Sequence, residues 1–491
     1  MLNHNNLYAY KENNRLEAKK AAGGLPKSIW QTYSAFANTN GGLILLGAEE
    51  KADKTLSIIG LENPEKLVLD FWNTVNNQQK VSTNLLNDKK VLIIEIEGES
   101  VIIIDVPRAE RTDKPIYLNN DIWNTYRRNG EGDYRCSKEN VKAMLRDNAE
   151  RTQDMLVLEK TPFSVFDYDT VKGYRNVMRA ARPNHVWIDL DDDDFLLKLG
   201  AISRGEDEKL HPTAAGLLMF GFEHEIVREY PHYYLDYQEH FDSGLRWSDR
   251  ITSTSGEWSG NLLGFYHKAY NKLIQNPNIK IPFKIENGYR VDDTPVHKAL
   301  REALANCLIN ADYYGEGGVI IKNCTDKITI ENPGILRIRI EEAISGGFSS
   351  PRNSVLMKMF NLLDIGERAG SGIPNIYSVW KTQKWECPQI SERFDSFERV
   401  CLTLPIEKAP IKSADKKVPI KSADKKSSSK TLKYKEGIIN LAQEKGEIKS
   451  ADLLEMLGIG ETRARTLLRE LVAEGMLVSE GGNRNKVYKT S

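Results

Sequence analysis

The sequence predicts a multidomain α+β protein that ends in a winged helix-turn-helix. Three observations lead to this prediction. The chain has 491 residues, more than a single hydrophobic core usually organises. Helix-like and strand-like segments alternate as far as residue 408, and a tandem repeat of PIKSADKK then precedes a short helical segment. We therefore expect five parts: residues 1–150, 151–285, 286–408, a flexible basic linker at 409–432, and 433–491.

The composition is that of a soluble globular protein. Hydrophobic residues make up 40% and charged residues 28%, and the net charge of −1 predicts no global attraction to nucleic acid or to an anionic membrane. The five cysteines lack metal-ligand spacing, and no apolar run approaches the roughly 18 residues of a membrane span. These features predict a cytoplasmic protein with no membrane partner.

The N-terminal part combines one amphipathic helix, LPKSIWQTYSAFAN, with the strand-like runs GLILLG, VLIIEIEG and VIIIDVPR. Its stretch KENNRLEAKKA carries Glu12 and Glu17, and LLGAEE ends in Glu50. Carboxylates that converge at strand ends can hold a divalent cation for phosphodiester cleavage. Spacing alone also fits a solvated acidic surface among lysines.

Residues 151–285 give a weaker pattern, which we interpret as a connecting or platform region. LHPTAAGLLMFG predicts a helix that begins at Thr213 or Pro212. The four aspartates 191–194 precede FLLKLGAI, and acidic residues favour the first turn of a helix. We expect a helix start there and no metal site.

The 286–408 part begins with the helix PVHKALREALANCLINADYY, which places Glu302 and Asn306 one turn apart on one face. A carboxylate there can polarise a water while the amide oxygen ligates Mg²⁺. The loop GSGIP, residues 370–374, offers backbone amides that suit phosphates. The same sequence pattern would also arise from a surface glutamate, an asparagine that caps the helix and an ordinary turn. The order helix, hairpin, glycine loop favours an α/β sandwich with a ligand between its elements.

The C-terminal part shows three short helical segments and a Gly-Asn hairpin, the pattern of a winged helix-turn-helix. Basic side chains on the third helix and the hairpin suit DNA contacts, and the basic linker adds attraction to phosphate. The same module could instead bind protein, because Glu461, Glu470 and Glu474 share the third helix. The candidate DNA-binding residues are Arg463, Arg465, Arg469, Arg484 and Lys486.

Three segments of the 286–408 part, EALANCLINADYY, IENPG and RAGSGIPNI, resemble the N box and the two glycine boxes of the GHKL ATPase superfamily. They resemble more closely the RecG-like C-terminal ATPase modules of bacterial ATP-binding proteins. The resemblance implies ATP and Mg²⁺ as cofactors, with Glu302 as general base and Asn306 as Mg²⁺ ligand. It also implies nucleotide contacts by Asn332, Gly334, Arg352, Asn353, Gly370, Ser371 and Gly372. The first glycine box of the superfamily offers an Asp to adenine, where this chain offers Glu331 or Asn332.

The stretches LEAKKA, AFANTNGG, LLGAEE and PIYLNNDIWNTYRRNGEGDYRCS are similar to the Schlafen AlbA-type domain over about 130 residues. In Schlafen nucleases two Glu and an Asp cut RNA, and Glu12, Glu17 and Glu50 match those positions, with Glu in place of Asp at residue 50. Bacterial members are described as DNA-binding modules. That reading implies phosphate contacts by Lys19, Lys20, Arg127 and Arg128.

Together these patterns favour an ATP-binding regulator that engages DNA, with RNA as a further partner, and that assembles as a homo-oligomer. The alternative is an ATP-gated, metal-dependent nuclease that acts on RNA or DNA, as in phage defence. A third reading is a scaffold in which the nucleotide is structural and the winged helix binds protein.

Overall fold

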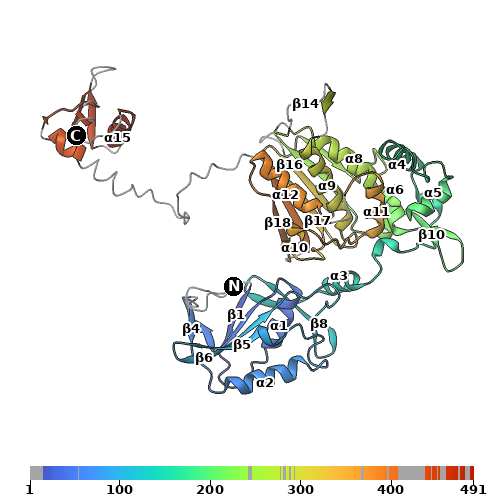
Figure 1. The fold of residues 1–491 in the computed structure, drawn as a ribbon, viewed down its shortest axis with the longest axis horizontal. Coiled ribbons are helices and arrows are strands. Elements are labelled where there is room, and N and C mark those ends of the chain that lie inside the picture. Colours follow the sequence, from blue (N-terminus) through green and yellow to red (C-terminus); the bar gives the residue numbers. More distant parts are fainter. Residues whose placement is uncertain are drawn as a thin grey trace. The chain divides into compact units, whose positions relative to one another are not determined.

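The computed structural model forms two compact units, Met1–Pro410 and Ile411–Ser491, each described by itself. It describes residues 15–53, 55–241, 246–276, 278–279, 284–286, 289–291, 294–366, 370–394, 397–406, 437–443, 445–450, 452–453, 461–473, 476–480 and 487–490. The predicted linker at 409–432 lies outside these residues. Mixed sheets and helices in several cores confirm the expected multidomain α+β class (Figure 1).

The N-terminal module of the first unit is built on a four-stranded sheet. Its order is β1 (Leu16–Lys19), β2 (Gly42–Leu46), β6 (Glu99–Val106), β5 (Val91–Ile96); β1 and β2 are parallel and the other pairs antiparallel. The three predicted apolar strands are β2, β5 and β6. The remaining elements are α1 (Ile29–Asn38), β3 (Ala48–Glu50), β4 (Leu56–Ile58), α2 (Pro64–Val75), the short helix η2 (Asp88–Lys90), β7 (Tyr117–Leu118), β8 (Asp121–Asn129) and β9 (Gly132–Arg135).

Helix α1 organises this module because nearly all of its residues are buried, among them Tyr33 and Phe36. Its last residue, Asn38, fastens the helix to the neighbouring chain. The Asn38 Nδ2 donates to the carbonyls of Ile116 at 2.9 Å and Tyr126 at 3.1 Å, and its Oδ1 accepts from the Ile116 amide at 2.9 Å. A fully satisfied buried amide fixes the helix against β8.

Helix α3 (Lys138–Asn148) follows the N-terminal module, and Ser137 caps it by accepting a hydrogen bond from the Asn140 amide at 3.1 Å. The next elements are η3 (Gln153–Met155), η4 (Phe163–Val165), α4 (Tyr168–Ala181), α5 (Asp192–Leu199), β10 (Ile202–Arg204), β11 (Leu210–Pro212), α6 (Ala214–Phe220) and α7 (Glu223–Glu229). The helix predicted at the aspartate run is α5. Asp191 caps it by accepting from the Asp194 amide at 2.9 Å.

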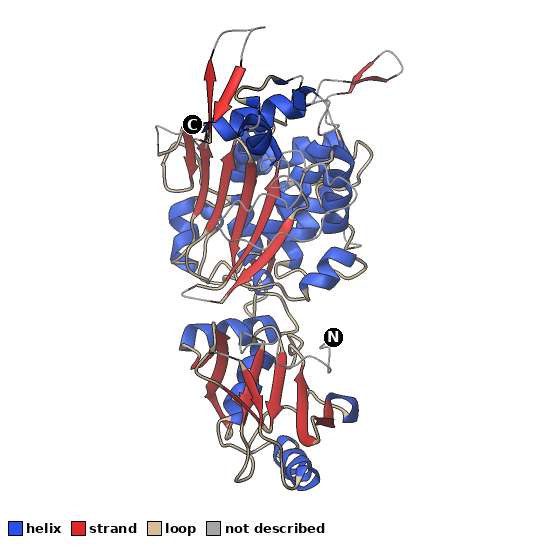
Figure 2. Ribbon diagram, turned by 90° about the vertical axis from the view of Figure 1, so that its left-hand side faces the viewer, coloured by secondary structure: helices blue, strands red, loops and turns tan. Residues whose placement is uncertain are grey.

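A six-stranded mixed sheet forms the centre of the first unit, in the order β13 (Asp249–Thr252), β12 (Leu235–His240), β16 (Val319–Cys324), β17 (Lys327–Pro333), β19 (Arg399–Pro405), β18 (Gln389–Arg393). Only β12 and β16 pair in parallel. Helices α8 (Leu262–Leu273), α9 (Pro295–Asn310), α10 (Ile340–Ser345), α11 (Ser354–Leu362) and α12 (Gly372–Gln383) accompany it, and β14 (Lys284–Glu286) pairs with β15 (Tyr289–Val291). Figure 2 shows the strands side by side with helices gathered on one face.

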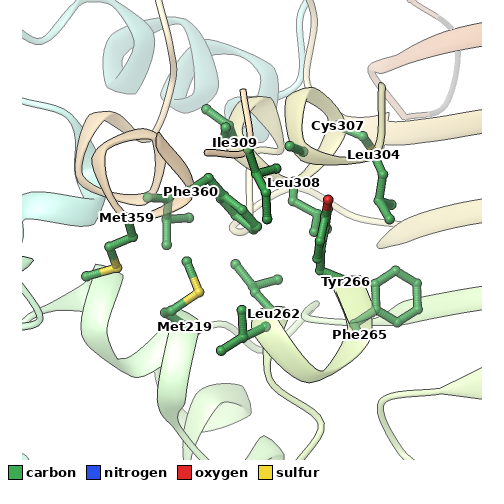
Figure 3. Close-up of a cluster of buried hydrophobic side chains, with 14 of the residues drawn as sticks. Met219, Leu262, Phe265, Tyr266, Leu304, Cys307, Leu308, Ile309, Met359 and Phe360 are labelled. Carbon is green, nitrogen blue, oxygen red and sulfur yellow. The ribbon is translucent and has the colours of Figure 1, made fainter. Parts of the chain in front are cut away.

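One hydrophobic core joins residues from Leu158 to Ile406, so the segments predicted as platform and as ATP-binding part pack together. Figure 3 shows its centre, where Leu308 of α9 meets Tyr266 of α8 and Phe360 of α11. In β16 the alternation of buried and half-buried residues points Val319 and Ile321 into this core. The core therefore holds α9 rigidly against the sheet.

The second unit has its own core, which includes Ile438, Leu467, Leu471 and Tyr488. Residues 437–443 are helical, and helix α15 (Glu461–Ala473) is followed by the antiparallel strands β20 (Leu477–Glu480) and β21 (Val487–Thr490). Across the described residues of both units, no helix combines the length and apolarity that a membrane span requires.

Candidate functional site

The polar face of α9 carries the candidate catalytic pair. Pro295 stands at the first helical position, and Thr294 caps the helix by accepting a hydrogen bond from the His297 amide at 3.4 Å. Two turns on, Glu302 is only 8% exposed, and the Nδ2 of Asn306 donates to its Oε1 at 3.0 Å. The Asn306 Oδ1 is thereby turned away from Glu302.

The glycine loop lies directly against this carboxylate. A Cβ on Gly372 would stand 2.0 Å from the Oε1 of Glu302, so only glycine allows this approach. Gly370 has a φ of +66°, and a Cβ there would stand 2.3 Å from the carbonyl oxygen of Phe348. Ser371 occupies the N-cap position of α12. The structure therefore brings together Glu302, Asn306 and all three predicted residues of the loop.

Two adjoining cavities open along α9. The first, of about 80 Å³, is lined by Glu302, Asn306, Gly370 and Gly372 together with the segment from Phe348 to Pro351. The second, of about 60 Å³, is mostly apolar, and its walls include Cys307, Ile330, Ile376, Val400 and Leu402. Both share Asn306, Asn310, Leu336, Arg337 and Ile373. We call the pair the α9 cleft; it has one polar end and one apolar end.

Strand β17 carries both residues that the sequence offered for the adenine contact, Glu331 and Asn332, and only Asn332 lines the apolar end of the cleft. Asn332 lines that cavity, with its Nδ2 donating to the Pro333 carbonyl at 3.1 Å. The Glu331 carboxylate accepts from Arg399 Nε at 3.2 Å and from Arg393 Nη2 at 3.3 Å, and Glu331 does not line the cleft. Successive residues of a strand point to opposite faces, so only one of the two can reach the ligand side.

Arg352 and Asn353 are held by protein groups. The Arg352 guanidinium donates from Nε to Asp147 Oδ1 at 2.9 Å and from Nη2 to Asp147 Oδ2 at 2.8 Å. The Asn353 Nδ2 donates to the carbonyls of Ile309 and Ala311, both at 2.9 Å, and so closes the C-terminus of α9. Both lie outside the α9 cleft and line a small neighbouring cavity.

Gly334 packs against the guanidinium group of Arg352. Its φ is +86°, and a Cβ there would stand 2.7 Å from the Arg352 Nη1. The structure therefore places Gly334 against Arg352, whereas Asn332 two residues earlier lines the cleft.

The three candidate carboxylates of the N-terminal module are only partly described. Glu12 lies outside the described residues. Glu17 on β1 accepts from Lys19 Nζ at 2.9 Å and forms an ion pair with Arg128 Nη2 at 2.9 Å. The Glu50 Oε1 on β3 is buried and makes no hydrogen bond to the residues that the structure describes. Within the described part of the chain, no cluster of three His, Cys, Asp or Glu residues could hold a metal.

The candidate phosphate-binding cations of this module make internal contacts. Lys19 pairs with Glu17, and Lys20, which is largely exposed, pairs with Glu49. Arg128 is 3% exposed, pairs with Asp133 at 3.0 Å and stacks over the Phe36 ring. Arg127 is 5% exposed, pairs with Glu398 and lies over the Phe394 ring. Burial leaves Lys20 as the one of these four that faces solvent.

Of the basic candidates in the second unit, the structure shows Arg469 as an exposed residue of α15. Arg463 and Arg465 lie on the same helix, and their side chains fall outside the described set, as do Arg484 and Lys486 altogether.

Sequence reasoning missed residues that shape the site from a distance. Arg337 lines both halves of the α9 cleft, and Asp147 anchors Arg352 from the end of α3. Arg337 stands in GILRIRI, where an arginine inside an apolar run was the available signal. Cys307 was visible only as a helix residue. Burial raises the pKa of its thiol, so it stays protonated and contributes an apolar wall.

Three protein-family models match parts of the chain. The Schlafen, AlbA_2 model matches residues 10–137, which makes the N-terminal module a Schlafen AlbA_2 domain. A model described as "Putative ATP-dependent DNA helicase recG C-terminal" matches residues 316–402. A domain of unknown function, DUF8451, matches residues 142–236. No curated protein matches the chain.

Six solved chains match it, and they include the following two proteins. A protein of Corynebacterium diphtheriae is 16% identical, with a TM-score of 0.39, over 97% of this chain and 95% of its own. The N-terminal domain of a "Putative ATP-dependent DNA Helicase RecG-related Protein" from Nitrosomonas europaea is 29% identical, with a TM-score of 0.22, over 28% of this chain and 95% of its own.

Proposed function

We propose that the protein is an ATP-binding regulator that engages nucleic acid, and that nucleotide occupancy of the α9 cleft controls this engagement. The observation that carries the proposal is the cleft itself. The buried Glu302, its half-buried partner Asn306 and a glycine loop at a helix N-terminus form its polar end, and an apolar cavity lined in part by Asn332 continues from it. Phosphates favour the first kind of environment and a purine base the second.

The residues of the cleft fit ATP and Mg²⁺. The amide groups at the start of α12 and the glycine at residue 372 leave room and partial positive charge for phosphate oxygens. The Asn306 Nδ2 is committed to Glu302, which leaves its Oδ1 for a hard cation. Bound Mg²⁺ would neutralise charge on the phosphates. The donors that this chain supplies support the proposal of GHKL-type nucleotide binding.

Glu302 would act as the general base of hydrolysis. Its carboxylate is nearly buried, oriented by Asn306, and lies at the polar end of the cleft. From there it can accept a proton from a water that attacks a terminal phosphate. Asn306 would position Glu302 and ligate the metal, and the Asn332 carboxamide would hydrogen-bond the base.

A route from the cleft to the Schlafen AlbA_2 domain runs through Leu336, which lines both ends of the cleft. The Arg108 Nη2 donates to the Leu336 carbonyl at 2.9 Å, and Arg108 also pairs with Glu392. The Leu336 amide in turn donates to Glu392 Oε1 at 2.8 Å. A nucleotide that favours one position of Leu336 would shift the equilibrium of this domain.

In the second unit, α15 and the β20–β21 hairpin would form a winged helix that contacts DNA. Arg463, Arg465 and Arg469 would lie on the recognition helix, and Arg484 and Lys486 on the wing. Attraction of this kind is electrostatic in large part and weakens with salt.

ATP binding tests the proposal most directly. Isothermal titration of the full chain with ATP and Mg²⁺ should show binding that Gly372→Ala weakens by about tenfold or more, because the new methyl group overlaps the Glu302 carboxylate. Gly173→Ala is the matched control, since a Cβ at Gly173 on α4 meets nothing within 4 Å. Absence of ATP binding by the unaltered chain, or equal binding by both variants, would overturn it.

A metal-dependent nuclease is the second candidate, and the buried Oε1 of Glu50, which has no hydrogen-bond partner among the described residues, favours it. A buried carboxylate oxygen without a partner is costly unless a cation occupies its free side. Labelled transfer RNA, single-stranded DNA and duplex DNA, each incubated with Mn²⁺ and ATP, would separate the two candidates. Cleavage abolished by Glu17→Ala selects the nuclease, and binding without cleavage selects the regulator.

A further inference from the structure

A small basic cavity lies within the first unit, away from the candidate catalytic pair. Four cations and two carboxylates line it: Arg108, Arg111, Lys114, Arg337, Asp147 and Glu398. Residues 108–114 come from the N-terminal module, Asp147 from the end of α3, and Arg337 and Glu398 from the part that carries the six-stranded sheet. By the same measure as the α9 cleft, the cavity has a volume of about 20 Å³, a quarter of that of the cleft's polar end.

The carboxylates at this cavity are already paired with other cations. Asp147 receives two hydrogen bonds from Arg352. Glu398 pairs with Arg127 and accepts from Asn140 Nδ2 at 2.7 Å, and Arg108 pairs with Glu392. With these partners included, six cations face three carboxylates, an excess of three positive charges.

Three of the lining cations have no close carboxylate of their own in the described structure. Lys114 is 6% exposed, and the one side-chain hydrogen bond that it makes to the described residues runs from Nζ to the Asn38 carbonyl at 3.4 Å. Arg111 donates to the carbonyl of Asp147 at 2.9 Å, at the C-terminus of α3. Arg337 donates to the carbonyls of Pro351 and Asp147, at 2.6 and 3.1 Å, and its Nε approaches Asp147 Oδ1 only to 4.0 Å.

Several donors around the cavity are also unsatisfied. The Nε of Arg337 and the Nε and Nη2 of Arg127 are buried and make no hydrogen bond to the described protein atoms. Burial lowers the pKa of Lys114 well below its usual range, and the charges of Arg108 and Arg127 lower it further. Buried cations and buried N–H groups without an acceptor destabilise the folded state unless an anion pairs with them.

We propose that this cavity binds a small oxyanion of the phosphate class. Guanidinium groups present parallel N–H donors that match two oxygens of such an anion, and Lys114 adds a point charge. The anion would join side chains of the Schlafen AlbA_2 domain to Arg337. Because Arg337 also lines the α9 cleft, the site connects that cleft with the N-terminal module. The inference does not depend on ATP binding.

Calorimetry of the full chain with sodium phosphate tests the site, with sodium chloride at equal ionic strength as the reference. We expect phosphate binding that Lys114→Met weakens by about tenfold or more, the loss of one hydrogen bond to a charged group. Lys66→Met, an exposed lysine of α2, is the matched control and should bind as the unaltered chain does. A thermal melt without phosphate checks folding, and Lys114→Met should melt no lower, because it removes a buried charge.

Two further arms identify the source of the anion. Gly372→Ala, which alters the α9 cleft, should leave phosphate binding unchanged; a parallel loss would show that phosphate binds in the cleft and would overturn the inference. The inference would also be overturned if a short oligonucleotide bound at this cavity and free phosphate did not. Calorimetric titration with sulfate in two buffers of different ionisation enthalpy measures the protons taken up on binding. We expect proton uptake because the anion favours the charged form of Lys114, and Lys114→Met should abolish it.

Discussion

Arg352 and Asp147 form a bidentate ion pair, with hydrogen bonds of 2.9 and 2.8 Å, between the segment that precedes α11 and the end of α3. The same guanidinium donates to the carbonyl of Ile335 at 2.7 Å, and Ile335 lines the apolar end of the α9 cleft. The Arg352 side chain therefore connects helix α3, which follows the Schlafen AlbA_2 domain, to the wall of the α9 cleft.

Breaking this pair should destabilise the first unit. Asp147→Asn leaves Arg352 buried with an uncompensated charge, which costs about 3 kcal/mol or more. Urea denaturation followed by tryptophan fluorescence measures the change. The matched control is Asp121→Asn, which breaks the exposed pair with Arg135 and should change stability by less than about 1 kcal/mol. Equal effects of the two substitutions would contradict the role assigned to Asp147.

The same pair predicts a dependence on acid. Burial raises the pKa of Asp147, but the charge of Arg352, its hydrogen bonds and the charges of Arg337 and Arg146 outweigh this and leave the pKa below its usual value. A carboxyl with a lowered folded pKa stabilises above its unfolded pKa, about 3.9, and this contribution is lost as pH falls through the folded pKa. Unfolding midpoints from pH 5 down to about pH 2 should fall less steeply for Asp147→Asn than for the unaltered chain.

Lys114 predicts a pH dependence of the same sign, but at high pH. Burial, then the charges of Arg108 and Arg127, lower its pKa, while Glu392 and Asp147 act against them. The unfolded chain therefore binds a proton that the folded chain resists, and stability rises with pH between the lowered pKa and about 10.4. Lys114→Met should flatten this rise in melting temperature between pH 7 and 10. An unchanged slope would show that Lys114 is not the group responsible.

Glu302→Gln should separate ATP binding from turnover. The glutamine keeps its size and can still accept from Asn306, but it cannot take a proton from water, so hydrolysis should fall by about a hundredfold or more. Phosphate release measures turnover, and calorimetry should show ATP affinity within a few fold of the original. Glu341→Gln on α10, an exposed position, is the control. Hydrolysis that survives Glu302→Gln would remove Glu302 as the base.

Removal of the second unit should reduce DNA binding. A chain that ends at Pro410 keeps the cores of the first unit, because the second unit has a separate core. If the winged helix contacts DNA, the truncated chain should bind duplex DNA at least about tenfold more weakly and with a shallower dependence on salt. Fluorescence anisotropy at several salt concentrations measures both. Unchanged affinity would assign DNA contact to the first unit.

The sequence was sufficient for the local features. Strands β2, β5 and β6 follow from apolar runs, α5 follows from an acidic first turn, and the Glu302–Asn306 contact follows from a four-residue spacing on a helix. Short stretches such as LEAKKA and AFANTNGG also led to the Schlafen AlbA_2 domain that a family model matches. Each of these depends on residues within a few turns of one another.

The tertiary structure decided what depends on partners far apart in the chain. Arg127 and Arg128 look like surface cations in the sequence, yet they are buried because Glu398, Glu17 and Asp133 fold onto them. Glu331 and Asn332 were equal candidates until the pairing of β17 with β19 turned one toward Arg399 and the other into the cleft. The excess positive charge around Lys114 arises only where the N-terminal module and the central sheet meet. Short-range spacing fixes a helix face, but burial and charge balance depend on long-range packing, which no local pattern records.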